Sequence, residues 1–95
     1  MRMQVTGAYL EWINSLEDRT SRARIQVRVD RLAHGNPSQY RNLADGVSGL
    51  RIDVGPGYRV YYTERGSELI VLLAGGDKST QQRDIKAAIA LARNL

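Results

Sequence analysis

The segment LRIDVGPGYRVYYTERGSELIVLLA, residues 50–74, carries the pattern that decides the fold of this 95-residue chain. From Leu50 onward, apolar and polar residues alternate, which is the two-residue period of a strand with one buried face. Gly55-Pro56-Gly57 and Arg65-Gly66-Ser67 are turn sequences, and they divide the segment into three strands. Consecutive strands joined by short turns pair as an antiparallel meander, which is therefore the predicted centre of a sheet.

The third strand of this meander, Glu68 to Ala74, contains the continuous apolar run LIVLL at 69–73. A run without polar residues is typical of a strand that is covered on both faces. Outside the meander, Met1 to Val5 is predicted as a short first strand and Tyr40 to Gly49 as a loop.

Three helices are predicted around the strands, since apolar residues recur at helical spacing in three places: Tyr9, Trp12, Ile13 and Leu16; Ile25, Val29 and Leu32; and Ile85, Ala88, Ile89 and Ala92. Asp18 or Thr20 is the predicted cap of the second helix, and His34-Gly35-Asn36-Pro37 ends it. Ser79 and Gln82 form a predicted capping box for the third helix. The predicted fold is α+β, in a single domain of residues 1–95. In it an N-terminal helical hairpin and a C-terminal helix pack on one face of a small antiparallel sheet of three to four strands, and the other face is freer.

Composition excludes several kinds of site. There is no Cys, which excludes disulfides, thiol nucleophiles and thiolate zinc sites, and a single His excludes a multi-histidine metal centre. The longest apolar run is far shorter than the about 18 residues that a membrane span needs. We therefore expect a cytoplasmic domain without a metal or another cofactor.

The charge balance favours a phosphate-bearing or acidic partner. Fourteen Lys and Arg against ten Asp and Glu give a net charge of +4, and every cation except Lys78 and Lys86 is Arg. The guanidinium group is planar and matches phosphate oxygens in two-point contacts. Nucleic-acid binding is one interpretation of this charge, and solubility alone is the other.

The central strand of the meander carries the strongest local signal. Arg59, Tyr61, Thr63 and Arg65 share one face because side chains alternate along a strand, and Arg51 is predicted to lie across the hairpin from this row. Such a row offers charge for phosphates and a flat ring for bases, as binding of a single nucleic-acid strand requires. A solvated sheet face is the alternative.

The segment AGGDKST, residues 74–80, follows an apolar strand and opens a helix, as a phosphate-binding loop does, but its glycine and lysine spacing does not match that motif. Lys78 beside a helix N-terminus still favours an anion there. Arg83 and Lys86, in the first turns of the last helix, are candidates for RNA contact, with a solvated helix surface as the alternative. His34 is predicted to cap a helix C-terminus rather than to catalyse.

Three motifs in this order, LRI at 50–52, GYRVYY at 57–62 and LLAGGDKS at 72–79, resemble the RelE/ParE toxin superfamily. More narrowly, the chain is similar to the HigB-like "addiction module killer" branch of type II toxin–antitoxin systems, and the resemblance covers nearly the whole chain. It implies a microbial-type RNase fold. Many such toxins cut messenger RNA in the ribosomal A site, whereas ParE-type members inhibit DNA gyrase.

The resemblance implies that Arg59, Arg51 and Lys78 are catalytic, since basic residues of the RNA-cutting members hold the message and stabilise the transition state. The predicted RNA-binding residues are Tyr61, Arg65, Arg83 and Lys86. The implied reaction needs no metal, because a ribose 2′-OH attacks its own 3′-phosphate while protein cations neutralise the growing charge. RNA-cutting relatives often carry a His or Tyr near the C-terminus as general acid or base. Here no His follows position 34 and no Tyr follows position 62, which leaves Asp53, Asp77 or the ribosome as the source of the base.

The resemblance also implies a partner. We expect a small antitoxin with a helix-turn-helix DNA-binding domain, whose acidic groups meet the Arg-rich sheet face in a toxin–antitoxin hetero-oligomer. The leading hypothesis is a ribosome-dependent endoribonuclease toxin. A non-enzymatic inhibitor of gyrase or another target, and a generic nucleic-acid-binding module, are the alternatives.

Overall fold

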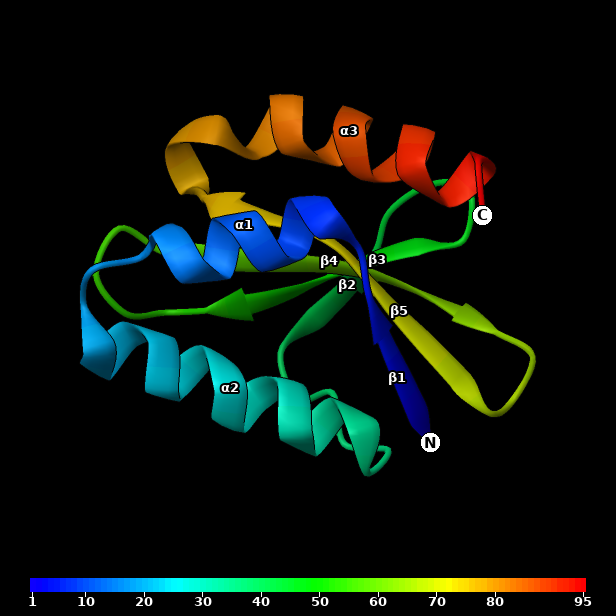
Figure 1. Cartoon of the computed structure of the whole chain (residues 1–95), viewed down its shortest axis with the longest axis horizontal. Helices are drawn as coiled ribbons and strands as arrows, with labels where there is room; N and C mark the ends of the chain where they lie inside the picture. Colours follow the sequence, from blue (N-terminus) through cyan, green and yellow to red (C-terminus); the bar gives the residue numbers. More distant parts are fainter.

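The computed structural model describes residues 1–95 as five strands, three α-helices and one 3-10 turn (Figure 1). In chain order these are β1 (Arg2–Val5), α1 (Gly7–Ser15), α2 (Arg19–Ala33), β2 (Tyr40–Asn42), β3 (Val47–Ile52), β4 (Tyr58–Arg65), β5 (Leu69–Asp77), η1 (Lys78–Thr80) and α3 (Gln81–Arg93). The predicted α+β class is confirmed, as are the meander and the short first strand. None of the helices is both long and apolar enough to cross a membrane.

The strands form one sheet in the order β1-β5-β4-β3-β2. Strands β3, β4 and β5 are antiparallel neighbours, as predicted, and β1 adds to the far edge in parallel with β5. Strand β2 pairs with β3, so the prediction of a loop over 40–49 and the count of three to four strands are wrong. All three residues of β2 are exposed, which is why no apolar alternation marks this strand in the sequence.

Helices cover both faces of the sheet, so the predicted freer face is also wrong. Helices α1 and α2 lie on one side and α3 on the other. Figure 1 shows α2 and α3 on opposite sides of the strands. On the first side Ile25 and Val29 of α2 pack in a cluster with Ile70 and Leu72 of β5. On the second side the buried residues are Val47, Tyr61, Val71, Leu73, Ala74, Ala88 and Ala92. The run LIVLL is therefore covered on both faces, as its composition predicts.

Side-chain caps fix the start of each helical segment except α3. Asp18 caps α2, as predicted, and accepts a hydrogen bond from the Thr20 amide, while the helix ends at His34. The predicted Ser79–Gln82 capping box is wrong. Asp77 caps the 3-10 turn η1 instead and accepts from the Ser79 amide at 2.8 Å, and α3 begins after it without a side-chain cap.

Gly75 and Gly76 belong to β5 and are required by the close approach of a side chain on each face. A Cβ at Gly75 would lie 2.1 Å from the Trp12 ring, and a Cβ at Gly76 would lie 1.8 Å from a carboxylate oxygen of Asp84. No real Cβ contact is that short. The glycine pair therefore lets α1 and α3 approach the end of β5 from opposite sides.

We expect Gly75→Ala to destabilise the fold by about 1–3 kcal/mol, because the added methyl group overpacks the site against the rigid indole of Trp12. Urea unfolding measures the change. Gly7→Ala is the matched control, since a Cβ at Gly7 meets nothing within 4 Å. Equal unfolding midpoints for the two variants would show that the close packing against Gly75 is absent.

Candidate functional site

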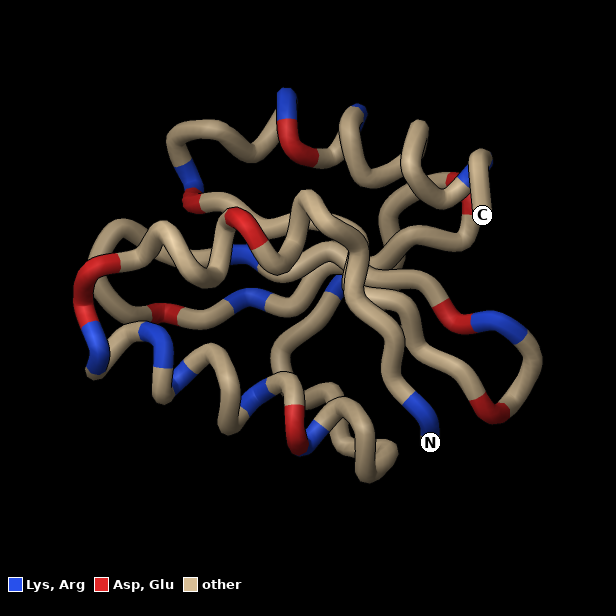
Figure 2. The backbone as a smooth tube through the Cα atoms, in the orientation of Figure 1, with Lys and Arg blue, Asp and Glu red and all other residues tan.

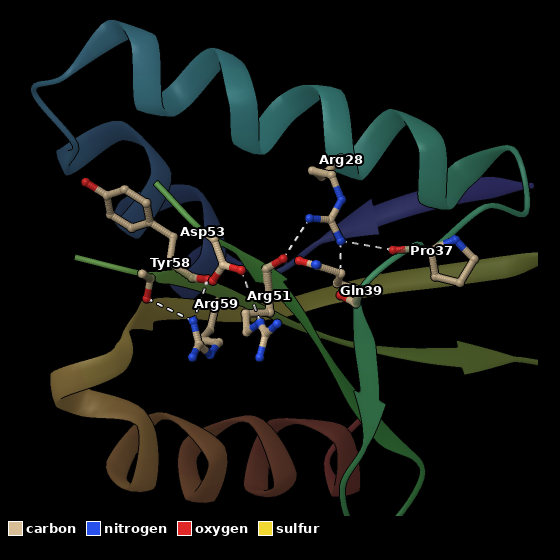
Figure 3. A network of polar contacts seen from close by, with 8 residues as sticks. Arg28, Pro37, Gln39, Arg51, Asp53, Tyr58 and Arg59 are labelled. Carbon is tan, nitrogen blue, oxygen red and sulfur yellow. Dashed lines mark hydrogen bonds and ion pairs between the residues drawn. The ribbon is translucent and has the colours of Figure 1, made fainter. Parts of the chain in front are cut away.

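Two arginines face each other across the β3–β4 hairpin. Arg51 and Arg59 are directly paired in the register, so their Cβ atoms are about 5 Å apart and both side chains lie on the α3 side of the sheet. Figure 3 shows the two guanidinium groups next to each other between the strands and α3. The prediction that Arg51 lies across the hairpin from Arg59 is confirmed. Like charges in directly opposed positions destabilise a sheet, so this pair favours the binding of an anion.

The paired arginines open onto a cleft of about 290 Å³ between the sheet and the first turns of α3. Its lining residues are Gln39, Tyr40, Arg41, Leu43, Gly49, Arg51, Arg59, Tyr61, Gln81 and Ile85. Arg41 adds a third guanidinium from β2, where it is paired with Gly49. Sequence reasoning missed Arg41 because it placed this residue in a loop. The absence of apolar alternation around it gave no signal of pairing.

Tyr61 lies against the inner wall of this cleft rather than on an open surface. Its side chain is only 1% exposed, so no ring face is free for a base to stack on, contrary to its predicted role. Its hydroxyl has no hydrogen-bond partner within the protein. Burial, together with a smaller effect of the charge of Asp84, raises the pKa of Tyr61 to about 12, although the charge of Arg59 acts to lower it. The group is therefore a neutral hydrogen-bond donor at ordinary pH, with its donor unused.

The backbone and one carboxylate hold the two paired guanidinium groups. A terminal nitrogen of Arg59 donates to the carbonyl oxygens of Gly57 at 3.1 Å and Tyr58 at 3.2 Å. The Nε of Arg51 lies 3.5 Å from a carboxylate oxygen of Asp53, and both side chains of this ion pair are more than half exposed. No Asp or Glu lines the cleft itself, so its three arginines keep most of their positive potential.

Arg28 of α2 fixes the backbone from which Arg51 projects (Figure 3). One terminal nitrogen donates to the Arg51 carbonyl at 2.6 Å, and the other donates to the carbonyls of Pro37 at 3.1 Å and Gln39 at 3.0 Å. The Arg51 amide in turn donates to the Gln39 carbonyl at 3.0 Å. Burial and the charge of Arg31 lower the pKa of Arg28. Its position on the polar side of a helical pattern gave no indication of this role.

The other predicted site residues lie at different distances from the cleft. Lys78 is exposed in η1, and both its Cβ and the Arg59 guanidinium come within 4 Å of the position that a Cβ on Gly57 would take. Arg65 is six residues along β4 from Arg59, about 20 Å away, where it donates to the Ala92 carbonyl at the end of α3. Arg83 and Lys86 are exposed on α3, and Arg83 pairs with its neighbour Asp84 at 3.7 Å. The structure therefore brings Lys78 near the arginine pair and leaves Arg65 apart from it.

Carboxylates lie at the start of α3, where the sequence predicts a bound anion beside Lys78. Asp77 accepts hydrogen bonds from the Ser79 hydroxyl and amide, and these bonds lower its pKa. The half-buried Asp84 accepts a bond from the Thr80 hydroxyl. Two negative groups at this helix start oppose a bound anion. Asp84, close to Tyr61, was not singled out by sequence reasoning, and no three His, Asp or Glu side chains form a group that could hold a metal ion.

Fold and site together define a small α+β protein with a cationic cleft, and comparison with known proteins gives its family. Residues 11–95 match the family described as "Phage derived protein Gp49-like (DUF891)". An uncharacterized protein of Haemophilus influenzae strain Rd is 41% identical over 95 residues, which is 100% of this chain and 96% of that relative. The chain belongs to the Gp49-like family of RelE-like toxins, which is associated with toxin–antitoxin systems. The RelE/ParE resemblance is confirmed at this level, and the HigB-like branch stays a prediction.

We expect inorganic phosphate to stabilise the protein more than chloride does at equal ionic strength, because phosphate can bridge the opposed guanidinium groups. At about ten times its dissociation constant, phosphate would add about 1.4 kcal/mol to the free energy of unfolding. Thermal unfolding measures the difference. Arg59→Gln and Arg51→Gln should lose most of this gain, whereas Arg19→Gln, at the exposed start of α2, should keep it. An equal phosphate effect in all four proteins would show that the cleft is not the anion site.

We expect Tyr61→Phe to be at least as stable as the native chain at pH 7, because the hydroxyl that it removes has no partner in the protein. The native protein should lose stability between pH 10 and 12. In that window the unfolded chain releases the Tyr61 proton while the folded state retains it, so the unfolded state gains as pH rises. The raised pKa of Tyr9, about 12, acts in the same direction. Urea unfolding at several pH values should give a shallower fall for Tyr61→Phe, and a less stable variant at pH 7 would mean that the hydroxyl has a partner.

Proposed function

We propose that this protein is the toxin of a type II toxin–antitoxin pair and that it cuts messenger RNA on the ribosome, in the cytoplasm, without a metal ion. The opposed arginines carry this proposal, since Arg51 and Arg59 open onto a cleft that also holds Arg41. Three cations suit a phosphodiester better than a carboxylate or an uncharged ligand, because a phosphate offers several acceptor oxygens at once. Membership of a family of RelE-like toxins supports the same conclusion.

The reaction proposed for the cleft is transesterification within the RNA. The ribose 2′-oxygen forms a bond to the adjacent phosphorus and loses its proton, while the bond from phosphorus to the 5′-oxygen of the next nucleotide breaks and that oxygen gains a proton. The products are a 2′,3′-cyclic phosphate and a 5′-OH. Negative charge grows on the non-bridging oxygens in the transition state, where the guanidinium groups of Arg51 and Arg59 stabilise it.

Tyr61 has a part in this proposal that differs from base stacking. Its ring forms part of the wall of the cleft, and its hydroxyl is buried and stays protonated because burial raises its pKa to about 12, so it neither contacts the bound phosphate nor acts as a base near neutral pH. Lys78, at the edge of the site, adds positive charge beside Arg59.

The candidate for the base is Asp53, whose exposed carboxylate is ion-paired with Arg51, although it lies outside the lining of the cleft and at the groove between α2 and the end of β3. Asp77 is a poorer candidate, since its carboxylate is engaged by Ser79 as a helix cap. A weak base suffices when the ribosome holds the message so that the 2′-oxygen, phosphorus and leaving oxygen are in line, because alignment alone removes much of the barrier.

The test is a translation extract programmed with a defined messenger, to which the purified native chain, Arg59→Gln, Arg51→Gln or Arg19→Gln is added. We expect the native chain and Arg19→Gln to cut the message and to leave 5′-OH ends, which are labelled by a polynucleotide kinase without prior phosphatase. Loss of one transition-state cation should slow cutting by about 100-fold. Mapping the ends by primer extension measures this.

Two results would overturn the proposal. Cutting by Arg59→Gln at the native rate would remove the arginine pair from the chemistry. An intact message together with inhibition of DNA supercoiling by gyrase would favour the non-enzymatic alternative, and salt-dependent RNA binding without either effect would favour a simple binding module.

A further inference from the structure

A second groove lies on the opposite face of the sheet from the cleft. It runs between α2 and the end of β3 and has a volume of about 400 Å³. Val27, at its rim, is 47% exposed. The aliphatic part of the groove is formed by Ala23, Val27, Ile52 and Val54.

Arginines of α2 line this apolar strip, and Asp53 is the one carboxylate at it. Arg24 and Arg31 stand three residues before and four residues after Val27, so all three lie on one side of α2. Helix α2 carries five Arg and one Asp, and Figure 2 shows the cations spaced along it. None of the ion pairs in the structure involves an arginine of α2. Arg24 and Arg31 are exposed, so their charges are free to meet a partner.

We infer that this groove, lined by α2 and the end of β3, binds an acidic amphipathic helix of the antitoxin. An aliphatic side chain of that helix packs on Val27, and its carboxylates pair with Arg24 and Arg31. The inference rests on the proposed function in that it requires an antitoxin. An aliphatic strip between two cations is complementary to a helix that alternates Leu-like and Glu-like positions, because both the apolar and the charged groups then find partners. RNA would pair with the arginines but leave the aliphatic strip in water.

The groove and the arginine pair lie on opposite faces of β3, although two residues that contact Arg51, Asp53 and Arg28, line the groove. Ile52 faces the groove, whereas the preceding residue, Arg51, faces the cleft on the other side of the strand. A helix in the groove therefore does not cover the guanidinium groups of the cleft. Substitutions at the rim of the groove should weaken the complex and leave messenger cutting intact.

The test measures the affinity of the native chain and its variants for the purified product of the gene adjacent to the toxin gene, by isothermal titration. Val27→Glu and Arg24→Glu should each weaken binding by at least tenfold, because the first places a carboxylate against an aliphatic side chain of the partner and the second places one opposite the partner's own carboxylate. Arg19→Glu makes the same change of charge on the same helix outside the groove, and it should change the affinity by less than twofold. All three positions are exposed and helical, so circular dichroism should show an unchanged fold.

A thiol gives a second, independent readout, because the chain contains no Cys. Val27→Cys, labelled with benzophenone-maleimide, should crosslink to an acidic helical segment of the adjacent gene's product, and mass spectrometry identifies the segment. Ala87→Cys, exposed on α3, should not crosslink to that segment.

The outcomes distinguish this inference from the proposed function. Native affinity in Val27→Glu and Arg24→Glu, or a crosslink from Ala87→Cys alone, would overturn the groove as the docking site while the toxin–antitoxin pairing stands. No binding of the adjacent product to the native chain, with the message still cut, would overturn the inference and leave the endoribonuclease. Loss of messenger cutting in the groove variants would assign the groove to RNA and overturn the inference as well.

Discussion

Strand β5 is apolar on both faces and has to be buried on both, and the rest of the structure depends on this constraint. Ile70 and Leu72 pack under α1 and α2, whereas Val71 and Leu73 pack under α3. Each such side chain stabilises the fold by about 1.5–3 kcal/mol when it is buried, so neither face can be left in water. The chain therefore has to return over the sheet after β5, which is what η1 and α3 do. The glycine pair at the end of β5 serves the same burial, because it lets one helix approach that point from each side of the sheet.

The cationic cleft lies where the cover by α3 ends. The buried stripe of α3 seals Tyr61 and the strands beneath it, but its first turns reach only to Gln81 and Ile85 at the wall of the cleft. Beyond that point the β3–β4 hairpin continues and presents Arg51 and Arg59. A guanidinium at such a boundary interacts more strongly with phosphate than one on an open surface, because protein rather than water fills part of the space around it. The Tyr61 hydroxyl is buried yet close to the arginine cleft for the same reason, since Tyr61 lies where the cover by α3 ends.

Much of the fold could be predicted because its signals are local. Strand β4 runs from the end of the first predicted turn to the start of the second, and the alternation along it correctly placed Arg59 on the same face as Tyr61 and across the hairpin from Arg51. The apolar run at 69–73 already required cover on both faces. The prediction of a freer face overlooked that requirement, because the apolar stripe of the last helix does not by itself say which side of the sheet it covers.

The parts of the site that sequence reasoning missed depend on contacts between distant segments. Arg41 reaches the cleft only because β2 pairs with β3, and three exposed residues carry no pattern that would indicate such pairing. From the sequence, Arg28 is indistinguishable from a solvated cation of α2. In the structure its guanidinium donates hydrogen bonds to backbone carbonyls of two other segments. Burial likewise changes the meaning of Tyr61. A tyrosine on a strand face is a stacking surface if the face is open and a hydrogen-bond donor if a helix covers it, and only the position of α3 decides between them.

Strand β3 separates two basic surfaces that have different chemistry, and this separation gives the arginines of the chain distinct uses. On one face, guanidinium groups paired across the β3–β4 hairpin suit a phosphodiester. On the other face, Arg24 and Arg31 flank aliphatic carbon, which suits a protein helix. Arg28 crosses between the two, from α2 to the carbonyl of Arg51, so a partner that moves α2 would act directly on the backbone that positions a cleft arginine. Binding on the groove face can therefore influence the cleft without covering it, because the two surfaces share this one hydrogen-bonded strand.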